Sequence, residues 1–335
     1  GSAVSVSGDA GVNFWDEEDD HPALPECYGM AGWTADGSAL VYDRHDIWKL
    51  SPAGAVRLTR GREKGLRYRY LRTRSDEEEP GLRSDETIYL SVFDFATKEN
   101  GIASLNLAKP EKSFRTLAFG GYSYSGVKKA EKGSALIYTK GNFREPMDLC
   151  FVSAPGKAEV RLSAINPQMG DYSWGTVELY KWNAFDGRPL EGLLYKPEDL
   201  DTSKKYPVII YFYEKDSETL YSHHQVQPMW SIINIPFFVS RGYVVFVPDI
   251  VYTPGLPGQS AYNCIVSGAE SLGQFPWIDM DNMGIQGQSW GGYEVAYLIT
   301  RTGMFKAAGA GAPVSNMTSA YGGIRWESGS SRQNQ

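Results

Sequence analysis

The stretch GIQGQSWGGYEVAYLITR, residues 284–301, places one serine in the pattern Gly-x-Ser-x-Gly. An apolar run precedes it and apolar residues recur at helical spacing after it, so the pattern predicts a strand, a sharp turn and a helix. In such a turn the backbone at Ser289 is strained, and its neighbours must lack bulk, as Gly287, Gly291 and Gly292 do. These features are typical of a nucleophile elbow, which stands at the strand ends of an α/β sheet.

The rest of the C-terminal half, residues 169–335, has the pattern of an α/β domain. TVELYKW and LEGLLYKP predict a hairpin, and YPVIIYFY and GYVVFVPD are the near-continuous apolar runs of strands covered on both faces. Helical candidates INIPFFVSR and AYNCIVSGAESLGQ lie between and after these two runs, and KAAGAGAP predicts one more strand after the elbow helix.

Residues 29–168 have a different period, with short strands separated by turns. They form three four-strand units of about 45 residues each, which is typical of propeller blades. The first unit, GMAGWTADGSALVYDRHDIWKLSPAGAVRLTRG, resembles WD40-like propeller repeats. A generic meandering β-domain is the alternative, and a closed propeller needs about four to eight blades. Residues 1–28 are interpreted as an N-terminal segment, with a tag remnant and an incomplete blade as its candidate origins.

Composition excludes several classes of function. The 335 residues carry 33 Lys and Arg against 40 Asp and Glu, and the net charge of −7 argues against a nucleic-acid partner. The three cysteines are scattered, which predicts neither a disulfide framework nor a zinc site, and Cys264 is interpreted as a small buried hydrophobe. No apolar run has membrane-spanning length. No cofactor or metal is implied.

The segments DGRPLEGLLYKP, YPVIIYFYE, GYVVFVPD, WIDMDNMGIQGQSWGGY and FKAAGAGAPVSN follow one another between residues 182 and 325. In this order they resemble the prolyl oligopeptidase family of serine peptidases, especially its dipeptidyl-peptidase-IV-like members. The resemblance implies a fold that combines an all-β part with an α/β part. The first is a partial β-propeller of about three blades, and the second is a truncated α/β-hydrolase domain. The resemblance also implies short peptide substrates and, as in bacterial relatives, a periplasmic or extracellular location. Oligomerisation is left open.

Three residues are candidates for the chemistry of acyl transfer. Ser289 is the expected nucleophile, which forms an acyl-enzyme. The backbone N–H of the residue after a nucleophile supplies one oxyanion donor, and that residue is Trp290. The resemblance assigns the second donor to the Tyr213 hydroxyl, after the run PVIIYFY. A plain strand-end aromatic is the alternative for Tyr213.

The resemblance also places a substrate pocket in the segment APVSNMTSAYGG. Val314 agrees with the family pattern, whereas Met317 stands where a tryptophan is typical and Ala320 where a tyrosine is typical. Tyr321 is a candidate substitute. A Met-lined pocket fits an apolar residue, so specificity for proline is left open. In the propeller half, the acidic run Glu77, Glu78 and Glu79 is interpreted as a solvated loop rather than as a site for a substrate amine. The earlier tract WDEEDD is also interpreted as a solvated loop.

The four histidines, His21, His45, His223 and His224, all precede Ser289. In α/β-hydrolases the order is serine, acid, histidine, so none of them is expected to be the base. The catalytic Asp and His are therefore expected downstream of this chain, which is interpreted as an internal fragment. The isolated 335-residue chain is expected to be inactive. An esterase on the same core and a non-catalytic binding protein are the two alternative functions.

Overall fold

The computed structural model describes residues 5–73, 81–229 and 232–331 and contains two compact units. The first unit consists of Pro25–Asn166 and Tyr221–His223 with the segment before Asp20. The second consists of Asp20–Leu24, Pro167–Leu220 and the residues from His224 onward.

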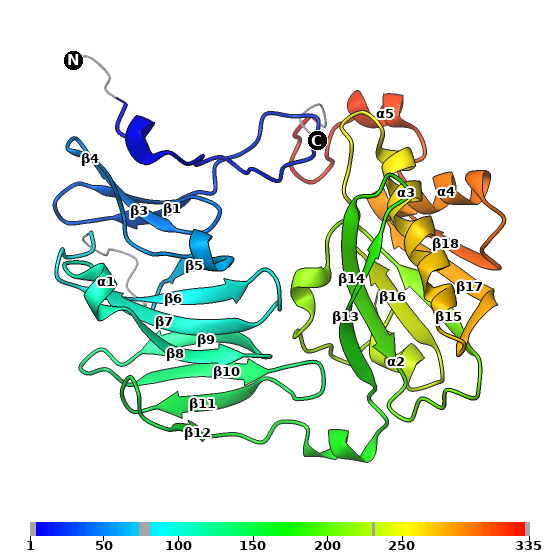
Figure 1. Cartoon of the computed structure of the whole chain (residues 1–335), viewed down its shortest axis with the longest axis horizontal. Helices are drawn as coiled ribbons and strands as arrows, with labels where there is room; N and C mark the ends of the chain where they lie inside the picture. The colour runs from blue at the N-terminus through cyan, green and yellow to red at the C-terminus, as the bar shows by residue number, and fades with distance from the viewer. Residues whose placement is uncertain (1–4, 74–80, 230–231, 332–335) are drawn as a thin grey trace. The chain divides into compact units, whose positions relative to one another are not determined.

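Within its described residues, the first unit contains three four-stranded antiparallel sheets, each built from consecutive strands (Figure 1). The first sheet consists of β1 (Met30–Trp33), β2 (Ala39–Tyr42), β3 (Ile47–Ser51) and β4 (Gly54–Arg57). The second consists of β5 (Leu66–Leu71), β6 (Thr87–Asp94), β7 (Asn100–Asn106) and β8 (Arg115–Gly120). The third consists of β9 (Ser123–Lys129), β10 (Leu136–Gly141), β11 (Asp148–Val152) and β12 (Glu159–Arg161). Short helical turns are η1 (Gly8–Ala10), η2 (Arg62–Lys64) and α1 (Pro110–Ser113).

Strand alternation explains how these sheets stack. Side chains of successive strand residues point to opposite faces. In β6, Ile88 and Leu90 pack into one core with Leu40 and other side chains of the first sheet. Tyr89 packs instead into a second core with Leu136 and other side chains of the third sheet. The middle sheet is therefore apolar on both faces and separates two cores.

A buried carboxylate closes the first sheet. Asp46 is fully buried, and its carboxylate accepts hydrogen bonds from the Thr59 hydroxyl at 2.6 Å and the Gly61 N–H at 2.5 Å. It also pairs with the Arg57 guanidinium, through Nε at 3.0 Å and Nη2 at 2.5 Å. The chain leaving β4 is held against β3 by these bonds.

The acidic tract after Trp15 corrects one expectation. Its backbone is irregular, but it is not a purely solvated loop, because Glu18 lies 2.6 Å from Arg44 and Glu17 lies 3.4 Å from Arg62. Arg44 lies in the turn between β2 and β3, and Arg62 begins η2, so the pairs link the N-terminal segment to that region. The sequence of an acidic tract does not indicate which distant residues will form ion pairs with it.

The second unit is built on a six-stranded sheet in the order β13-β14-β16-β15-β17-β18 (Figure 1). Its strands are β13 (Thr176–Asn183), β14 (Pro189–Lys196), β15 (Tyr206–Tyr211), β16 (Val244–Pro248), β17 (Ile278–Gln288) and β18 (Ala307–Gly311). The helices are α2 (Ile235–Val239), α3 (Pro257–Ser271), α4 (Trp290–Arg301) and α5 (Met317–Tyr321), with the short turns η3 (Pro167–Asp171), η4 (Ser217–Thr219) and η5 (Leu272–Gln274). The four strands β15 to β18 are mutually parallel, and β13 and β14 form the antiparallel hairpin.

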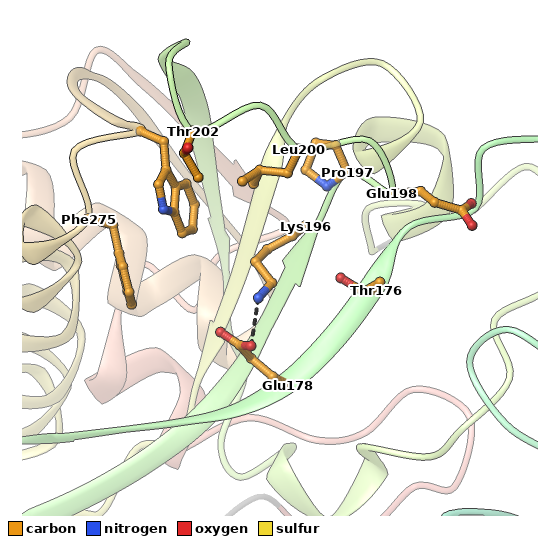
Figure 2. A pocket seen from close by; sticks show the side chains of 9 residues that line it. Thr176, Glu178, Lys196, Pro197, Glu198, Leu200, Thr202 and Phe275 are labelled. Atoms are coloured by element: carbon orange, nitrogen blue, oxygen red, sulfur yellow. Dashed lines mark hydrogen bonds and ion pairs between the residues drawn. The ribbon is translucent and has the colours of Figure 1, made fainter.

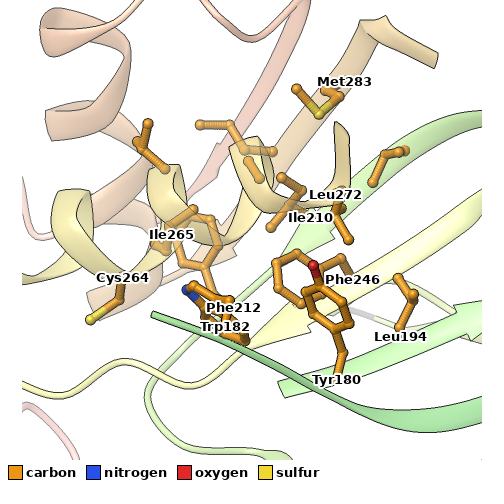
Figure 3. Packing of buried hydrophobic residues seen from close by; sticks show 14 of the residues in the cluster. Tyr180, Trp182, Leu194, Ile210, Phe212, Phe246, Cys264, Ile265, Leu272 and Met283 are labelled. Atoms are coloured by element: carbon orange, nitrogen blue, oxygen red, sulfur yellow. The ribbon is translucent and has the colours of Figure 1, made fainter. Parts of the chain in front are cut away.

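The core of this unit lies between the sheet and α3 (Figure 3). Phe246 of β16 contacts Trp182 edge-on, with ring centroids 5.3 Å apart, and a Cβ at Gly268 of α3 would lie 2.9 Å from the Phe246 ring. The Trp182 indole donates to Ser267 Oγ at 3.1 Å, which satisfies its buried N–H. Cys264, 2% exposed, packs in the same core as a small hydrophobe.

Strand order brings two loops together at one edge of the sheet. The chain passes from β15 to β16 on one side of β15 and then to β17 on its other side. Where successive connections diverge in this way, the loops after the parallel strands leave a crevice at their carboxyl ends. The loop after β15 and the turn after β17 therefore lie next to each other.

Replacement of Asp46 by alanine is expected to destabilise the protein by about 3 to 5 kcal/mol, because it leaves the buried Thr59 hydroxyl and Gly61 N–H without their acceptor and removes one of the two acid partners of the half-buried Arg57. Urea-induced unfolding measures this loss. The matched control is Asp36→Ala, which removes an exposed partner of Lys49 in the same sheet and is expected to cost much less. Equal effects of the two substitutions would contradict the role given to Asp46.

Candidate active site

Ser289 occupies the turn between β17 and α4. Its backbone has φ 58° and ψ −108°, a conformation that costs a non-glycine residue about 1 to 3 kcal/mol. Neighbouring backbone holds it there, because the Ser289 N–H donates to the Gly311 carbonyl at 2.8 Å and its carbonyl accepts from the Val314 N–H at 3.3 Å. The residue is half-buried. These backbone contacts hold Ser289 at the carboxyl edge of the sheet.

The three elbow glycines are required by contact distances. A Cβ at Gly287 would lie 2.4 Å from the Gly291 carbonyl carbon, and a Cβ at Gly291 would lie 2.6 Å from the Phe212 carbonyl oxygen. A Cβ at Gly292 would lie 2.5 Å from the Gly311 carbonyl oxygen. Since real Cβ contacts of this length do not occur with backbone atoms, any larger residue would force the turn away from its neighbours.

The loop after β15 passes beside the start of α4. Tyr213 lies in a bend two residues after the strand ends and is 40% exposed. Its Cα lies 3.7 Å from the Cβ position of Gly291. Trp290 is the first residue of α4, where backbone N–H groups have no partner within the helix. The structure thus brings the segments of all three candidate residues together.

A buried carboxylate fixes the Tyr213 loop. Asp249, directly after β16, accepts from the Asp216 N–H at 2.7 Å and from the Ser217 N–H at 2.9 Å. The Ile250 N–H donates to the Glu214 carbonyl at 2.7 Å. Burial raises the pKa of the Asp249 carboxyl, and burial with the nearby Asp249 charge raises that of Asp216. The loops after β15 and β16 are therefore tied to each other.

A hydrogen-bonded cluster lies behind the elbow. The Trp290 indole N–H donates to the Tyr252 hydroxyl at 3.0 Å, and that hydroxyl lies 2.5 Å from Glu294 Oε1. Glu294 is fully buried on α4. Burial raises its pKa from the ordinary 4.5 to about 8, and the Glu214 charge adds to the rise, while the Tyr252 hydrogen bond opposes it. Burial and the Glu294 charge likewise raise the pKa of Tyr252.

The four histidines have described contacts away from Ser289. His21 lies 3.8 Å from Glu214, and His224 Nε2 lies 3.3 Å from the Tyr195 hydroxyl. In the first unit, His45 Nδ1 lies 2.8 Å from the Leu66 carbonyl and His223 Nδ1 lies 3.1 Å from the Asn142 carbonyl. None of these contacts gives Ser289 a base.

The predicted pocket residues lie on and before α5. Val314 is half-buried next to the elbow, while Met317 and Tyr321 are 39% and 64% exposed at opposite ends of this helix. The Asn316 side chain caps the helix by accepting from the Ser319 N–H at 3.0 Å. Met317 and Tyr321 thus present apolar surface. The acidic run 77–79 lies outside the described residues.

A separate hollow of about 470 Å³ lies at the opposite end of the sheet (Figure 2). Lys196 ends β14 there and pairs with Glu178 at 2.6 Å. Trp277, also in its wall, immediately precedes β17, so the hollow lies at the amino ends of the parallel strands. The remaining lining residues are Thr176, Pro197, Glu198, Leu200, Thr202 and Phe275. It is not part of the site around Ser289.

Two further observations concern only the described residues. Among them, no helix is long and apolar enough to cross a membrane. Within the same residues, no group of three or more His, Cys, Asp or Glu side chains is arranged to hold a metal ion.

Asp249, Tyr252 and Glu294 were not identified from sequence. Asp249 did carry a signal, because an acid directly after a buried parallel strand lies at the ligand-binding edge of the sheet. Tyr252 follows in the same loop and carried no comparable signal. Glu294 lies on the buried face of α4, one turn after Trp290. Helical spacing predicts that this position is buried, and a glutamate is unusual at a buried position.

The buried state of Glu294 predicts how stability depends on pH. Between about pH 4.5 and pH 8 the unfolded chain has lost the proton that the folded chain keeps, so raising the pH favours unfolding. Over this window the unfolding free energy should fall more steeply in the wild type than in Glu294→Gln, by up to about 1.4 kcal/mol per pH unit. Urea unfolding of the 335-residue chain at several pH values measures this. The exposed Glu270→Gln is the control, and equal slopes for wild type and Glu294→Gln would refute the assignment.

Comparison with known proteins identifies the C-terminal region. Residues 229–334 match the model of the prolyl oligopeptidase family. Over 151 residues the chain is 32% identical to dipeptidyl peptidase 8 of Mus musculus, an alignment that covers 41% of the chain and 17% of the relative. It is 24% identical over 222 residues to dipeptidyl-peptidase 5 of Porphyromonas gingivalis, covering 62% of the chain and 31% of the relative.

Solved structures agree with the fold. Porphyromonas gingivalis dipeptidyl peptidase 4 superposes with a TM-score of 0.64 at 19% identity, covering 88% of this chain and 44% of that one. Pyrococcus horikoshii acylaminoacyl peptidase gives 0.59 at 18%, covering 85% and 44%. The chain thus spans less than half the length of these relatives. Residues 229–334 thus match the prolyl oligopeptidase family, and the chain is similar to dipeptidyl peptidases over part of their length.

Proposed function

We propose that this chain carries the nucleophile and the oxyanion site of a serine peptidase that hydrolyses short peptides. The observation that carries the proposal is the strained backbone of Ser289 at the start of α4, beside the loop of Tyr213. Peptidase names among the relatives support amide hydrolysis over ester hydrolysis.

In the proposed reaction, Ser289 Oγ attacks the scissile carbonyl carbon and forms a tetrahedral intermediate whose oxygen is negatively charged. The Trp290 N–H and the Tyr213 hydroxyl donate to that oxygen, and the N-terminal end of α4 adds a favourable dipole. Collapse of the intermediate expels the amine, which takes up the proton that the base removed from Ser289, and leaves an acyl group on Ser289. Water then attacks the acyl-enzyme and releases the acid product.

The serine proton needs a base, and the proposal places the catalytic histidine and its acid outside the 335 residues, because every histidine here precedes Ser289. The three sheets over residues 29–168 are proposed to be propeller blades, and residues 169–335 part of the hydrolase domain. Val314, Met317 and Tyr321 are proposed to contact an apolar substrate residue.

Full-length protein is expected to cleave aminoacyl-dipeptide amides, and Ser289→Ala is expected to lower turnover by about 10⁴-fold or more. The 335-residue chain alone is expected to show little turnover, because Ser289 lacks a base. Comparable turnover by the isolated chain would show that a base lies within it. Turnover of a simple ester without turnover of the peptide amides would favour an esterase, and no labelling of Ser289 by a fluorophosphonate would favour a binding protein.

Tyr213→Phe should lower kcat of the full-length protein by about 10²-fold, as the loss of one oxyanion donor does. Tyr211→Phe is the matched control, since it removes a hydroxyl from the neighbouring strand end. Thermal unfolding of both variants should match the wild type. An unchanged kcat in Tyr213→Phe would remove Tyr213 from the oxyanion site.

A further inference from the structure

The Tyr252 hydroxyl contacts both residues of the proposed oxyanion site. It lies 3.0 Å from the Trp290 indole nitrogen and 3.3 Å from the Tyr213 carbonyl oxygen. Its third neighbour is Glu294 Oε1 at 2.5 Å. One hydroxyl thus joins the first residue of α4 to the loop after β15.

Counting protons distinguishes two states of this cluster. The indole can only donate, so the Tyr252 oxygen accepts from Trp290. If Glu294 is ionised, the single Tyr252 proton points to the carboxylate, and the Tyr213 carbonyl receives none. If Glu294 is protonated, its O–H donates to the Tyr252 oxygen, and the Tyr252 proton is free to reach the Tyr213 carbonyl. All three contacts are hydrogen bonds only in the protonated state.

Burial of Glu294 favours that protonated state. The side chain is 0% exposed to solvent, and its Oε2 has no hydrogen-bond partner among the described residues. The titratable groups that act on it or feel its charge are Tyr252 and Glu214 from neighbouring loops, Cys264 from α3 and Tyr293 from α4. An uncompensated carboxylate there would be costly.

We propose that Tyr252, hydrogen-bonded to the buried Glu294, is a positioning residue that fixes the Tyr213 loop and the Trp290 side chain in one arrangement for catalysis. This inference rests on the proposed function. Loss of the Glu294 proton redirects the Tyr252 hydroxyl away from the Tyr213 carbonyl and loosens the Tyr213 donor. The proposed site is thereby sensitive to pH through a group that touches no substrate atom.

The test is the pH profile of kcat and KM in the full-length protein. Tyr252→Phe should lower kcat by about tenfold or more with little change in KM, since small displacements of catalytic groups mainly affect the transition state. In the wild type kcat should fall as the pH rises past about 8. Glu294→Gln should keep kcat and lose this alkaline fall, because the amide donates to Tyr252 at every pH, whereas Glu294→Ala should lower kcat throughout.

Tyr297→Phe, which removes a hydroxyl from the same helix, is the matched control. If Tyr252→Phe behaves like Tyr297→Phe, or if Glu294→Gln keeps the alkaline fall, the positioning role is overturned while Ser289-dependent turnover still supports the peptidase. Absence of Ser289-dependent turnover in the wild type overturns both proposals. If Tyr252→Phe folds poorly, the difference in kcat and its pH profile between Glu294→Gln and Glu294→Ala is the test.

Discussion

The close backbone approach at the elbow is the constraint on which the second unit depends. β17 can turn directly into α4 only because Gly287 and Gly291 let the two elements touch, and the resulting strain falls on Ser289. The strain persists because β17 is held on both sides, by β15 and by β18. A sheet that fixes the strand so firmly leaves the Ser289 backbone no relaxed alternative.

Around this turn, polar groups rather than apolar packing set the shape of the loops. Asp249 accepts from two N–H groups of the loop that follows Tyr213, and Glu294 is buried on α4, one turn after Trp290. Both are acids in a low-dielectric environment with raised pKa values. Buried acids of this kind cluster where loops must keep one geometry for chemistry, and they make the region sensitive to pH in a way that the apolar core is not.

Sequence predicted the strands well because their signals are local. The alternation in TIYLSVFD and the continuous apolar run GYVVFVPD each define a strand without knowledge of its neighbours, as β6 and β16 show. The elbow was predictable for the same reason, since the small residues around Ser289 are adjacent in sequence. The Trp290–Tyr252–Glu294 cluster was not, because it joins side chains 38 and 42 positions apart. The ion pairs of the acidic tract escaped for the same reason, since the partners of Glu17 and Glu18 lie on later elements.

The two-sided middle sheet of the first unit has a consequence for how damage spreads. β6 and β7 supply side chains to the core shared with the first sheet and to the core shared with the third. The outer sheets each take part in one of these cores, so either can loosen while the other core stays intact, as in a repeat array whose units contact only their neighbours. The effect of a change in β6 is not limited to one core in this way. Each side chain of β6 enters at most one core, but a substitution that displaces the backbone of this strand weakens both shared cores at once.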